Sequence, residues 1–327
     1  QYSYDWADLA FGSKKPLREL KATFIAAPRE LSEKRFKQLM KQYLPEGDIV
    51  LGVAKEPFVV GFEEQPQFRM LELPAVQKPI EQINAASPRH VYTLHYFQRE
   101  LVSILEKLRF KKVLLVNGSW QYVFHSSPAY YYLASSGTPY EMVSPFTDEA
   151  EARTYETTTD AKIIARLDTK NKDLLGKKRY SSKEMLTIAS IGGARSYDYS
   201  FQTGVALGIA DAADQYTYVM DSFNKVVPYQ TYALHHGSSR EKYFSPPNDL
   251  NHYDAVHAEV ELLIKMQRAR IHLKDATMFI NLMPCPTCAR MLSETTIAEF
   301  VYSIDHSDGY AVKLLEAAGK TVRRVIV

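Results

Sequence analysis

The sequence is poor in cysteine, in long apolar runs and in net charge. Only two cysteines occur among 327 residues, which excludes a fold held together by a framework of disulfides. No window approaches the roughly 18 uninterrupted apolar residues that a membrane helix needs, so we expect no membrane association. The formal net charge is +2 and the basic residues are scattered, so the composition does not demand a polyanionic partner.

The start of the sequence lacks the pattern of a signal peptide. Residues Gln1 to Trp6 show no charged segment followed by an apolar one. Apolar residues make up 46% and charged residues 24% of the chain, an ordinary balance for a globular protein. We therefore expect a soluble cytoplasmic protein whose length suits about two domains.

Two nucleotide-binding signatures are also absent. The sequence contains neither G-x-G-x-x-G nor G-x-x-x-x-G-K-[ST], the glycine-rich loops that bind dinucleotides and nucleoside triphosphates. Gly118 and Ser119 follow a predicted strand, where a turn can approach a phosphate, but a single Gly-Ser pair does not define a site. The aromatic run Tyr130–Tyr132 is more typical of a core or an interface than of a base-stacking surface.

The first half has the pattern of an α/β domain. Two amphipathic stretches, Glu33–Tyr43 and Gln98–Leu108, place their apolar residues on one helical face. The predicted strands are Ala22–Ala27, Asp48–Val53, His90–Tyr96, Lys112–Asn117 and Tyr140–Val143. Because alternating strands and helices favour a mostly parallel sheet, we expect a Rossmann-like domain at 1–150, followed by a polar linker at 151–181.

A second α/β pattern occupies 182–327. The predicted helices are Lys183–Ala194, Asp254–Arg268, Pro286–Thr295 and Gly309–Ala318. The predicted strands are Gly204–Ile209, Val226–Ala233, Thr277–Leu282, Glu299–Ile304 and Thr321–Val327. Ser181 or Ser182 is suited to cap the first helix, and Gly319 is suited to end the last one.

The residues that carry chemistry lie at two of these helix starts. His257 and Glu259 occupy the beginning of one helix, and Cys285 and Cys288 lead into the next. Cysteines three residues apart direct both sulfurs to one side of a helical turn, and a helix N-terminus stabilises thiolates. The intervening strand, Thr277–Leu282, brings the two helix starts together. A C-x-x-C pair by itself is equally consistent with a redox dithiol or with two buried thiols.

The complete set of residues predicts a zinc site with a proton carrier beside it. One imidazole and two thiolates fill three corners of a zinc tetrahedron and leave the fourth for water, which is the pattern of a catalytic zinc. We therefore predict that His257, Cys285 and Cys288 bind Zn²⁺. Glu259 lies two residues after the histidine and is expected to move protons rather than to bind the metal. H-x-E followed by P-C-x-x-C is the signature of zinc deaminases that act on nucleobases.

With these motifs, residues 182–327 resemble the cytidine/deoxycytidylate deaminase superfamily. The resemblance rests on His257-Ala258-Glu259, on Pro284 to Ala289, and on the ending from Glu299 to Gly319, which is similar to that of the deoxycytidylate enzymes. It implies a five-stranded mixed sheet sandwiched by helices and association into a homo-oligomer. It also implies that the backbone near Ala258 forms a hydrogen bond to the base.

The resemblance has one gap on the substrate side. Those families place an asparagine, which contacts the sugar, in the loop after the second strand. With that strand at Val226–Ala233, the following loop reads Leu234 to Ser239 and contains no asparagine, and an insertion at Tyr243–Tyr253 comes next. We name His236 and Ser238 as candidates for substrate binding in this loop, where an ordinary polar turn is the alternative.

Three functions are compatible with these observations. The leading hypothesis is zinc-dependent hydrolytic deamination of a cytosine-type base in a free nucleotide or nucleoside. Editing of a base in RNA or single-stranded DNA is the first alternative, and the scattered charge speaks against it. A regulatory or scaffold protein with a structural zinc is the second alternative. Glu259 argues against the scaffold, because a structural site has no use for a proton carrier.

Overall fold

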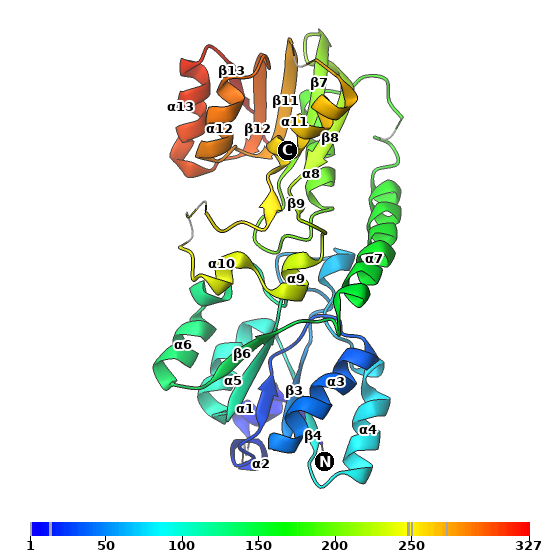
Figure 1. Cartoon of the computed structure of the whole chain (residues 1–327), viewed down its shortest axis with the longest axis vertical. Helices are drawn as coiled ribbons and strands as arrows, with labels where there is room; N and C mark the ends of the chain where they lie inside the picture. Colours follow the sequence, from blue (N-terminus) through cyan, green and yellow to red (C-terminus); the bar gives the residue numbers. More distant parts are fainter. Residues whose placement is uncertain (1, 13–14, 175, 247–248, 250, 273) are drawn as a thin grey trace. The chain divides into compact units, whose positions relative to one another are not determined.

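The computed structural model describes residues 2–12, 15–174, 176–246, 249, 251–272 and 274–327. These residues form two compact units, which Figure 1 colours along the chain. The N-terminal unit comprises Gln1–Thr159 and Thr231–Tyr253, and the C-terminal unit comprises Asp160–Gln230 and Asp254–Val327. The segment 231–253 therefore packs with the N-terminal unit, although it lies in the second half of the sequence. None of the helices in these described ranges is long and apolar enough to cross a membrane.

The N-terminal unit is built on a six-stranded sheet in which every neighbouring pair of strands is parallel. The strand order is β1-β4-β3-β2-β5-β6. The strands are β1 (Ser3–Asp5), β2 (Thr23–Ile25), β3 (Ile49–Ala54), β4 (Val91–Tyr96), β5 (Lys112–Val116) and β6 (Tyr140–Val143). The predicted Rossmann-like parallel sheet is confirmed, with β1 as an additional edge strand.

The order of the strands reverses beside β2. From β2 the chain adds β3 and β4 on one side, and it then returns to add β5 and β6 on the other side. The carboxyl ends of β2 and β5 are therefore neighbours at the point of reversal. In open parallel sheets this point is where ligands usually bind.

Helix α3 (Glu33–Tyr43) shows how the helices of this unit pack on the sheet. It begins after Ser32, whose hydroxyl accepts a hydrogen bond from the Arg35 N–H group at 3.0 Å. Its apolar face, including Phe36 and Leu39, joins one buried cluster with the strands and with α4 (Gln77–Ala86). The other helices are α1 (Trp6–Phe11), α2 (Lys15–Arg18), α5 (Leu101–Leu108), α6 (Pro128–Ser136), α9 (Tyr232–His236) and α10 (Ser239–Lys242).

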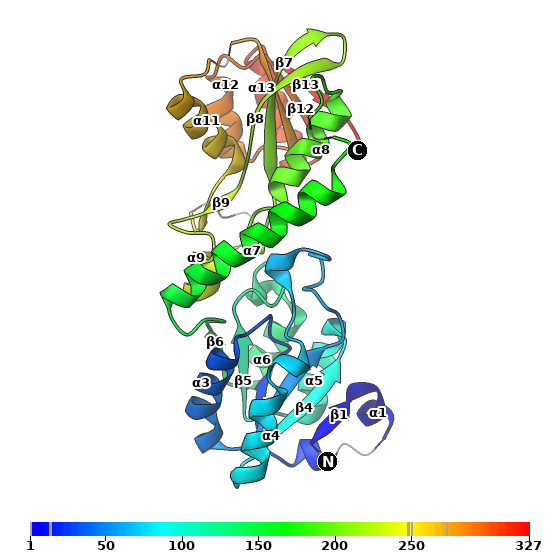
Figure 2. The same cartoon turned by 90° about the vertical axis from the view of Figure 1, so that its right-hand side faces the viewer.

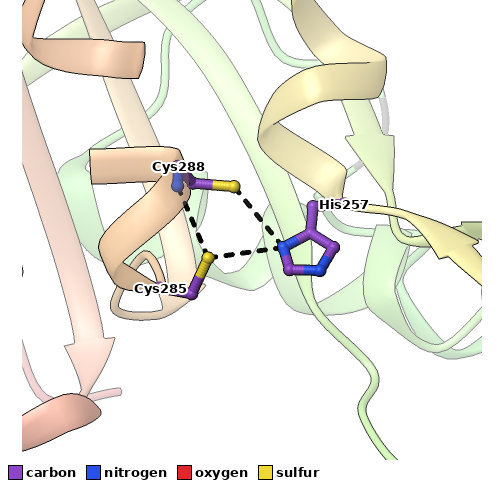
Figure 3. A group of neighbouring side chains, drawn as sticks. All are labelled: His257, Cys285 and Cys288. Carbon is purple, nitrogen blue, oxygen red and sulfur yellow. Dashed lines mark hydrogen bonds between the residues drawn. The ribbon is translucent and has the colours of Figure 1, made fainter. Parts of the chain in front are cut away.

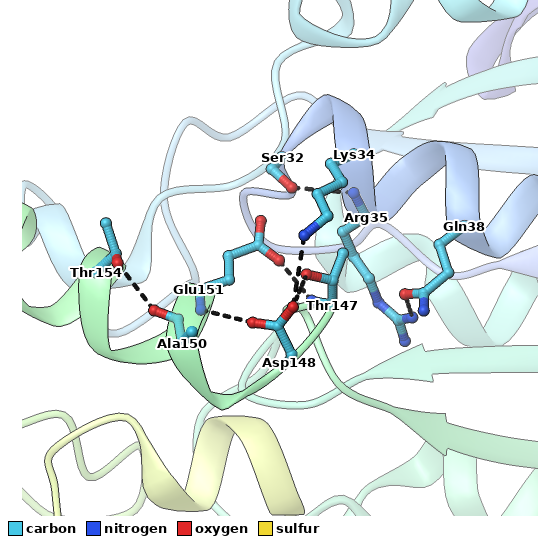
Figure 4. A network of polar contacts seen from close by, with 9 residues as sticks. All are labelled: Ser32, Lys34, Arg35, Gln38, Thr147, Asp148, Ala150, Glu151 and Thr154. Carbon is cyan, nitrogen blue, oxygen red and sulfur yellow. Dashed lines mark hydrogen bonds and ion pairs between the residues drawn. The ribbon is translucent and has the colours of Figure 1, made fainter.

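The interval expected to be a linker contains a helix of 22 residues, α7 (Glu149–Lys170). Figure 4 shows the polar contacts at its N-terminal end, one of which is an ion pair with Lys34 of α3. Asp148 accepts a hydrogen bond from the Glu151 N–H group at 2.9 Å, and its carboxylate lies 3.5 Å from Lys34 Nζ. Glu151 in turn accepts from the Thr147 N–H group at 2.5 Å. The polar composition that suggested a linker belongs to a helix whose side chains are mostly solvated.

The C-terminal unit contains the five-stranded mixed sheet that the resemblance implies. Its order is β13-β12-β11-β7-β8. Strand β7 is antiparallel to both of its neighbours, and the remaining pairs are parallel. The strands are β7 (Gly204–Ala212), β8 (Gln215–Phe223), β11 (Ala276–Leu282), β12 (Glu299–Ile304) and β13 (Thr321–Arg324).

Helices cover both faces of this sheet, as Figure 2 shows. Val205 and Leu207 of β7 belong to one buried cluster with α11 (Ala258–Ala269), α12 (Pro286–Ser293) and α13 (Tyr310–Ala317). Ala206, between them, belongs to a second cluster with α8 (Ser182–Gly193). This alternation is the period of a strand buried on both faces. The predicted cap is confirmed, because the Ser181 hydroxyl accepts from the Glu184 N–H group.

The second strand of this unit differs from the prediction. We expected Val226–Ala233, but β8 spans Gln215–Phe223. Of the predicted residues, Val226 ends the short strand β9 (Lys225–Val226), which pairs with β10 (Ala255–Val256), and Tyr232 and Ala233 begin α9. Strand β8 lies at the edge of the sheet. Its sequence, QYTYVMDSF, is rich in aromatic and β-branched residues, which favour a strand, and the prediction did not use this signal.

Gly204, at the start of β7, gives the first test of this packing. A Cβ atom at this position would lie 1.8 Å from the Ala189 carbonyl oxygen and 2.4 Å from the Gly193 nitrogen, both of which are backbone atoms of α8. We expect Gly204→Ala to lower the free energy of unfolding by about 3 kcal/mol or more, because the strand and helix must separate. Urea unfolding followed by circular dichroism measures this change.

Gly319→Ala is the matched control. Gly319 has a φ of +79°, and a Cβ atom added there would meet none of the described residues within 4 Å. That substitution should therefore cost only the ~1 kcal/mol of a left-handed alanine. A smaller loss for Gly204→Ala than for Gly319→Ala would contradict the packing described.

Candidate metal centre

The three predicted metal ligands lie at the starts of two neighbouring helices (Figure 3). His257 immediately precedes α11, and Cys285 immediately precedes α12, whose first residue is Pro286. Proline at this position favours a helix start, because its nitrogen has no hydrogen to leave unpaired. Cys288 follows in the first turn of α12, so its sulfur lies on the same side as that of Cys285. Strand β11 connects the two helices.

The ligand atoms converge at distances that suit a tetrahedral metal. His257 Nδ1 lies 3.6 Å from Cys285 Sγ and 3.4 Å from Cys288 Sγ, and all three ligand atoms lie within 4.8 Å of one another. Zinc bonds of about 2.3 Å to sulfur and about 2.0 Å to nitrogen separate such atoms by about 3.6 Å in a tetrahedron. The sequence prediction that these residues form one group therefore agrees with the geometry.

Burial and mutual hydrogen bonds set the protonation of the two cysteines. Both are buried, and the Cys288 N–H group donates to Cys285 Sγ at 3.4 Å. The Cys288 thiol also donates to Cys285, which lowers the pKa of Cys285, with His257 as a further cause. The same hydrogen bond raises the pKa of Cys288. One proton is therefore shared between two sulfurs, and a metal ion that binds both thiolates must displace it.

Glu259 lies beside this group without belonging to it. It is in the first turn of α11 and is 2% exposed. Burial raises the pKa of its carboxyl group, which also contacts the Cys288 thiol. A carboxyl group whose pKa is raised toward neutrality can both accept and release a proton. Ala258, between Glu259 and His257, is completely buried as well.

The two candidate substrate residues belong to the N-terminal unit. His236 ends α9, is exposed, and has its ring 4.5 Å from the rings of Tyr232 and His235. Ser238 precedes α10 and is 5% exposed. The structure does not bring either residue together with the metal ligands within one unit. A substrate role for His236 and Ser238 stays a prediction.

The predicted absence of an asparagine after the second strand is wrong. Because β8 ends at Phe223, the next residue, Asn224, is the first one after the second strand. Asn224 Oδ1 accepts from the Thr203 N–H group at 3.0 Å. Its amide nitrogen donates to the Phe201 carbonyl at 2.7 Å and to Asp198 at 3.2 Å. The sequence prediction lacks this residue because it places the second strand too late in the sequence.

Together the fold and the site define a class of protein. A five-stranded mixed sheet carries H-x-E at one helix start and P-C-x-x-C at the next, and the imidazole and both thiols converge. This combination is typical of the zinc-dependent nucleobase deaminases. Residues 209–304 match the family model of the cytidine and deoxycytidylate deaminase zinc-binding region. Residues 209–304, most of which lie in the C-terminal unit, therefore carry the zinc-binding region of the cytidine/deoxycytidylate deaminase superfamily.

Individual relatives are similar over a short part of the chain. A probable deoxycytidylate deaminase of Caenorhabditis elegans is 33% identical over 67 residues, which cover 20% of this chain and 32% of that protein. The deoxycytidylate deaminase of Saccharomyces cerevisiae is 37% identical over 70 residues, covering 21% of this chain and 22% of that protein. The matched part thus spans at most a third of either relative.

A solved structure is also similar to part of the chain. The dCMP deaminase of the cyanophage S-TIM5, in complex with dCMP and dUMP, is 17% identical, with a TM-score of 0.34. The similarity covers 44% of this chain and 95% of that protein.

Proposed function

We propose that this protein catalyses zinc-dependent hydrolytic deamination of a cytosine-type base in a free nucleotide or nucleoside. The observation that carries the proposal is the convergence of His257, Cys285 and Cys288 with a buried carboxyl group, that of Glu259, beside them. A redox dithiol would need neither the imidazole nor the carboxyl group. A purely structural zinc site would have a fourth protein ligand.

The chemistry of the donor set fits Zn²⁺. One imidazole nitrogen and two sulfurs match the ligands that zinc prefers, and three protein ligands leave one position open. When bound there, zinc would supply a Lewis acid that makes water a nucleophile near neutral pH. The residues that would hold it are His257, Cys285 and Cys288.

Glu259 would move the protons of the reaction. Its carboxylate would take a proton from the attacking water as the oxygen forms a bond to the amino-bearing carbon of the base. It would deliver this proton to the adjacent ring nitrogen, then take the second proton from the new hydroxyl group and deliver it to the leaving amine, which departs as ammonia. The balance is one water consumed and one ammonia released, with a carbonyl in place of the amine. Burial of Glu259 supports this role, because the raised pKa of its carboxyl group favours proton return.

The residues that contact the substrate are also part of this proposal. We propose that the backbone at Ala258 binds the base edge and that Asn224 binds the sugar, since a carboxamide oxygen can accept two hydrogen bonds. His236 and Ser238 are proposed as further substrate contacts. A homo-oligomer is proposed by resemblance to the superfamily.

Ammonia release by the zinc-loaded full chain tests the proposal. The substrates are cytosine, cytidine, deoxycytidine and their monophosphates, together with RNA and single-stranded DNA oligonucleotides. We expect turnover of about 1 s⁻¹ or more on a free nucleotide or nucleoside. Turnover on oligonucleotides alone would instead support editing of nucleic acid. No release from any substrate would support the scaffold.

A further inference from the structure

Arg29 carries a charged group that is buried without the partners it needs. It follows β2 in the N-terminal unit, and its side chain is 0% exposed. Its Nη2 atom donates to the Gln67 carbonyl at 2.5 Å and to the Tyr155 hydroxyl at 3.2 Å. Its Nε and Nη1 atoms are buried and have no hydrogen-bond partner among the described residues. Three N–H bonds of the guanidinium therefore lack an acceptor.

No carboxylate of the described residues compensates this charge. None of the ion pairs found among them involves Arg29, and the guanidinium carbon instead lies 5.6 Å from the centroid of the Tyr155 ring. A buried charge is costly unless it is both paired and hydrogen-bonded. Arg35, another buried arginine of this unit, has more acceptors, because its Nε donates to the Ser144 carbonyl at 2.9 Å and its Nη1 donates to Gln38.

The position of Arg29 is the one where an open parallel sheet binds ligands. Its backbone N–H group donates to Ser119 Oγ at 2.9 Å and so ties the end of β2 to the end of β5. Asn117 Oδ1, at the end of β5, is also buried without a partner in the described part of the chain. Gly118, between them, has a φ of +73°, a conformation that glycine adopts easily and that permits close approach of a ligand to the backbone. These groups lie at the point where the strand order reverses.

We propose that Arg29 and the ends of β2 and β5 form a binding site for a phosphate group. A phosphate has several acceptor oxygens and negative charge, which is what the unpaired guanidinium lacks, and arginine binds this group well. The ring of Tyr155 is the group that a ligand displaces, since it lies over the guanidinium. The site lies wholly in the N-terminal unit and does not depend on the proposed deaminase activity. With this site, the N-terminal unit would bind a ligand independently of the C-terminal unit.

Isothermal titration of the zinc-loaded full chain with inorganic phosphate, at constant ionic strength, tests the site. Ribose 5-phosphate and acetate serve as further probes. Wild-type protein should bind phosphate, and Arg29→Met should weaken binding at least ~10-fold, since charge-assisted hydrogen bonds are lost. Arg35→Met and Glu259→Gln should bind phosphate as the wild type does. Tighter binding of ribose 5-phosphate than of phosphate would identify a phosphate ester as the ligand, and the reverse would identify the free ion.

Several results would overturn the site, and one measurement guards against misfolding of the variant. Wild-type protein that binds no phosphate, or that binds acetate more tightly than either phosphate probe, contradicts the proposal. Equal phosphate binding by Arg29→Met contradicts it as well. Hydrogen exchange on wild-type protein needs no variant: phosphate should slow amide exchange at 25–29 and 117–120. Unchanged exchange in both segments at saturating phosphate would place the ligand elsewhere.

Discussion

Glu259→Gln should lower the rate of ammonia release by about 10³-fold and leave the zinc in place. The amide keeps the shape of the buried side chain but cannot take a proton from water or return one to the base. General acid–base catalysis contributes about 10²- to 10⁴-fold, and Glu259 is proposed to act in more than one proton transfer. The ligands His257, Cys285 and Cys288 are untouched, so metal content should stay near that of the wild type. Steady-state rates and zinc analysis of the same preparations measure both effects.

Glu261→Gln is the matched control for this substitution. Glu261 also lies in the first turn of α11, but its side chain is only half-buried and is not part of the metal group. The substitution removes the same charge from the same helix start, so any effect of the helix dipole is shared by both variants. Its rate should remain close to that of the wild type. If Glu259→Gln keeps more than a tenth of the wild-type rate, Glu259 is not the proton carrier.

Cys285→Ser should reduce bound zinc from about one per chain to nearly none, with loss of activity. A serine hydroxyl is a poor ligand for zinc compared with a thiolate, and two remaining protein ligands do not hold the ion. The fold should survive, because Cys285 caps α12 and serine is a favoured residue for that position. Loss of metal can then be separated from unfolding by comparing circular dichroism with zinc content.

Thr287→Ser provides the control for this change. Thr287 lies between the two cysteines and is exposed, so its substitution alters the same turn without removing a ligand. Zinc content and rate should both match the wild type. Full zinc loading in Cys285→Ser would show that the metal is bound elsewhere.

The metal group could be predicted from sequence because its geometry is local. Each ligand lies at a helix start, and the spacing of Cys285 and Cys288 fixes their sulfurs on one side of a single turn. The strand β11 between the two helix starts is a buried apolar run, which the sequence reveals clearly. For the same reason β12 was predicted with its observed bounds, Glu299–Ile304.

Features that depend on distant contacts were not predicted. Strand β8 lies at a sheet edge and only some of its side chains are buried, so its bounds were misplaced and the asparagine that follows it, Asn224, was not predicted. The segment 231–253 packs with the N-terminal unit, and nothing in its composition distinguishes it from the sequence around it. Arg29 likewise belongs to no motif. Arg29 stands out only because its side chain is buried after β2. That burial depends on residues as distant in the sequence as Tyr155.

The central claim is that the zinc-loaded chain releases ammonia from a cytosine-type base with Glu259 as the proton carrier. The most direct test is the rate of ammonia release from free nucleotides and nucleosides, measured for wild-type and Glu259→Gln protein with equal zinc content. The account predicts measurable turnover by the wild type on at least one of these substrates and a rate about 10³-fold lower for the variant. Equal rates for the two proteins, or no turnover by the wild type, would contradict it.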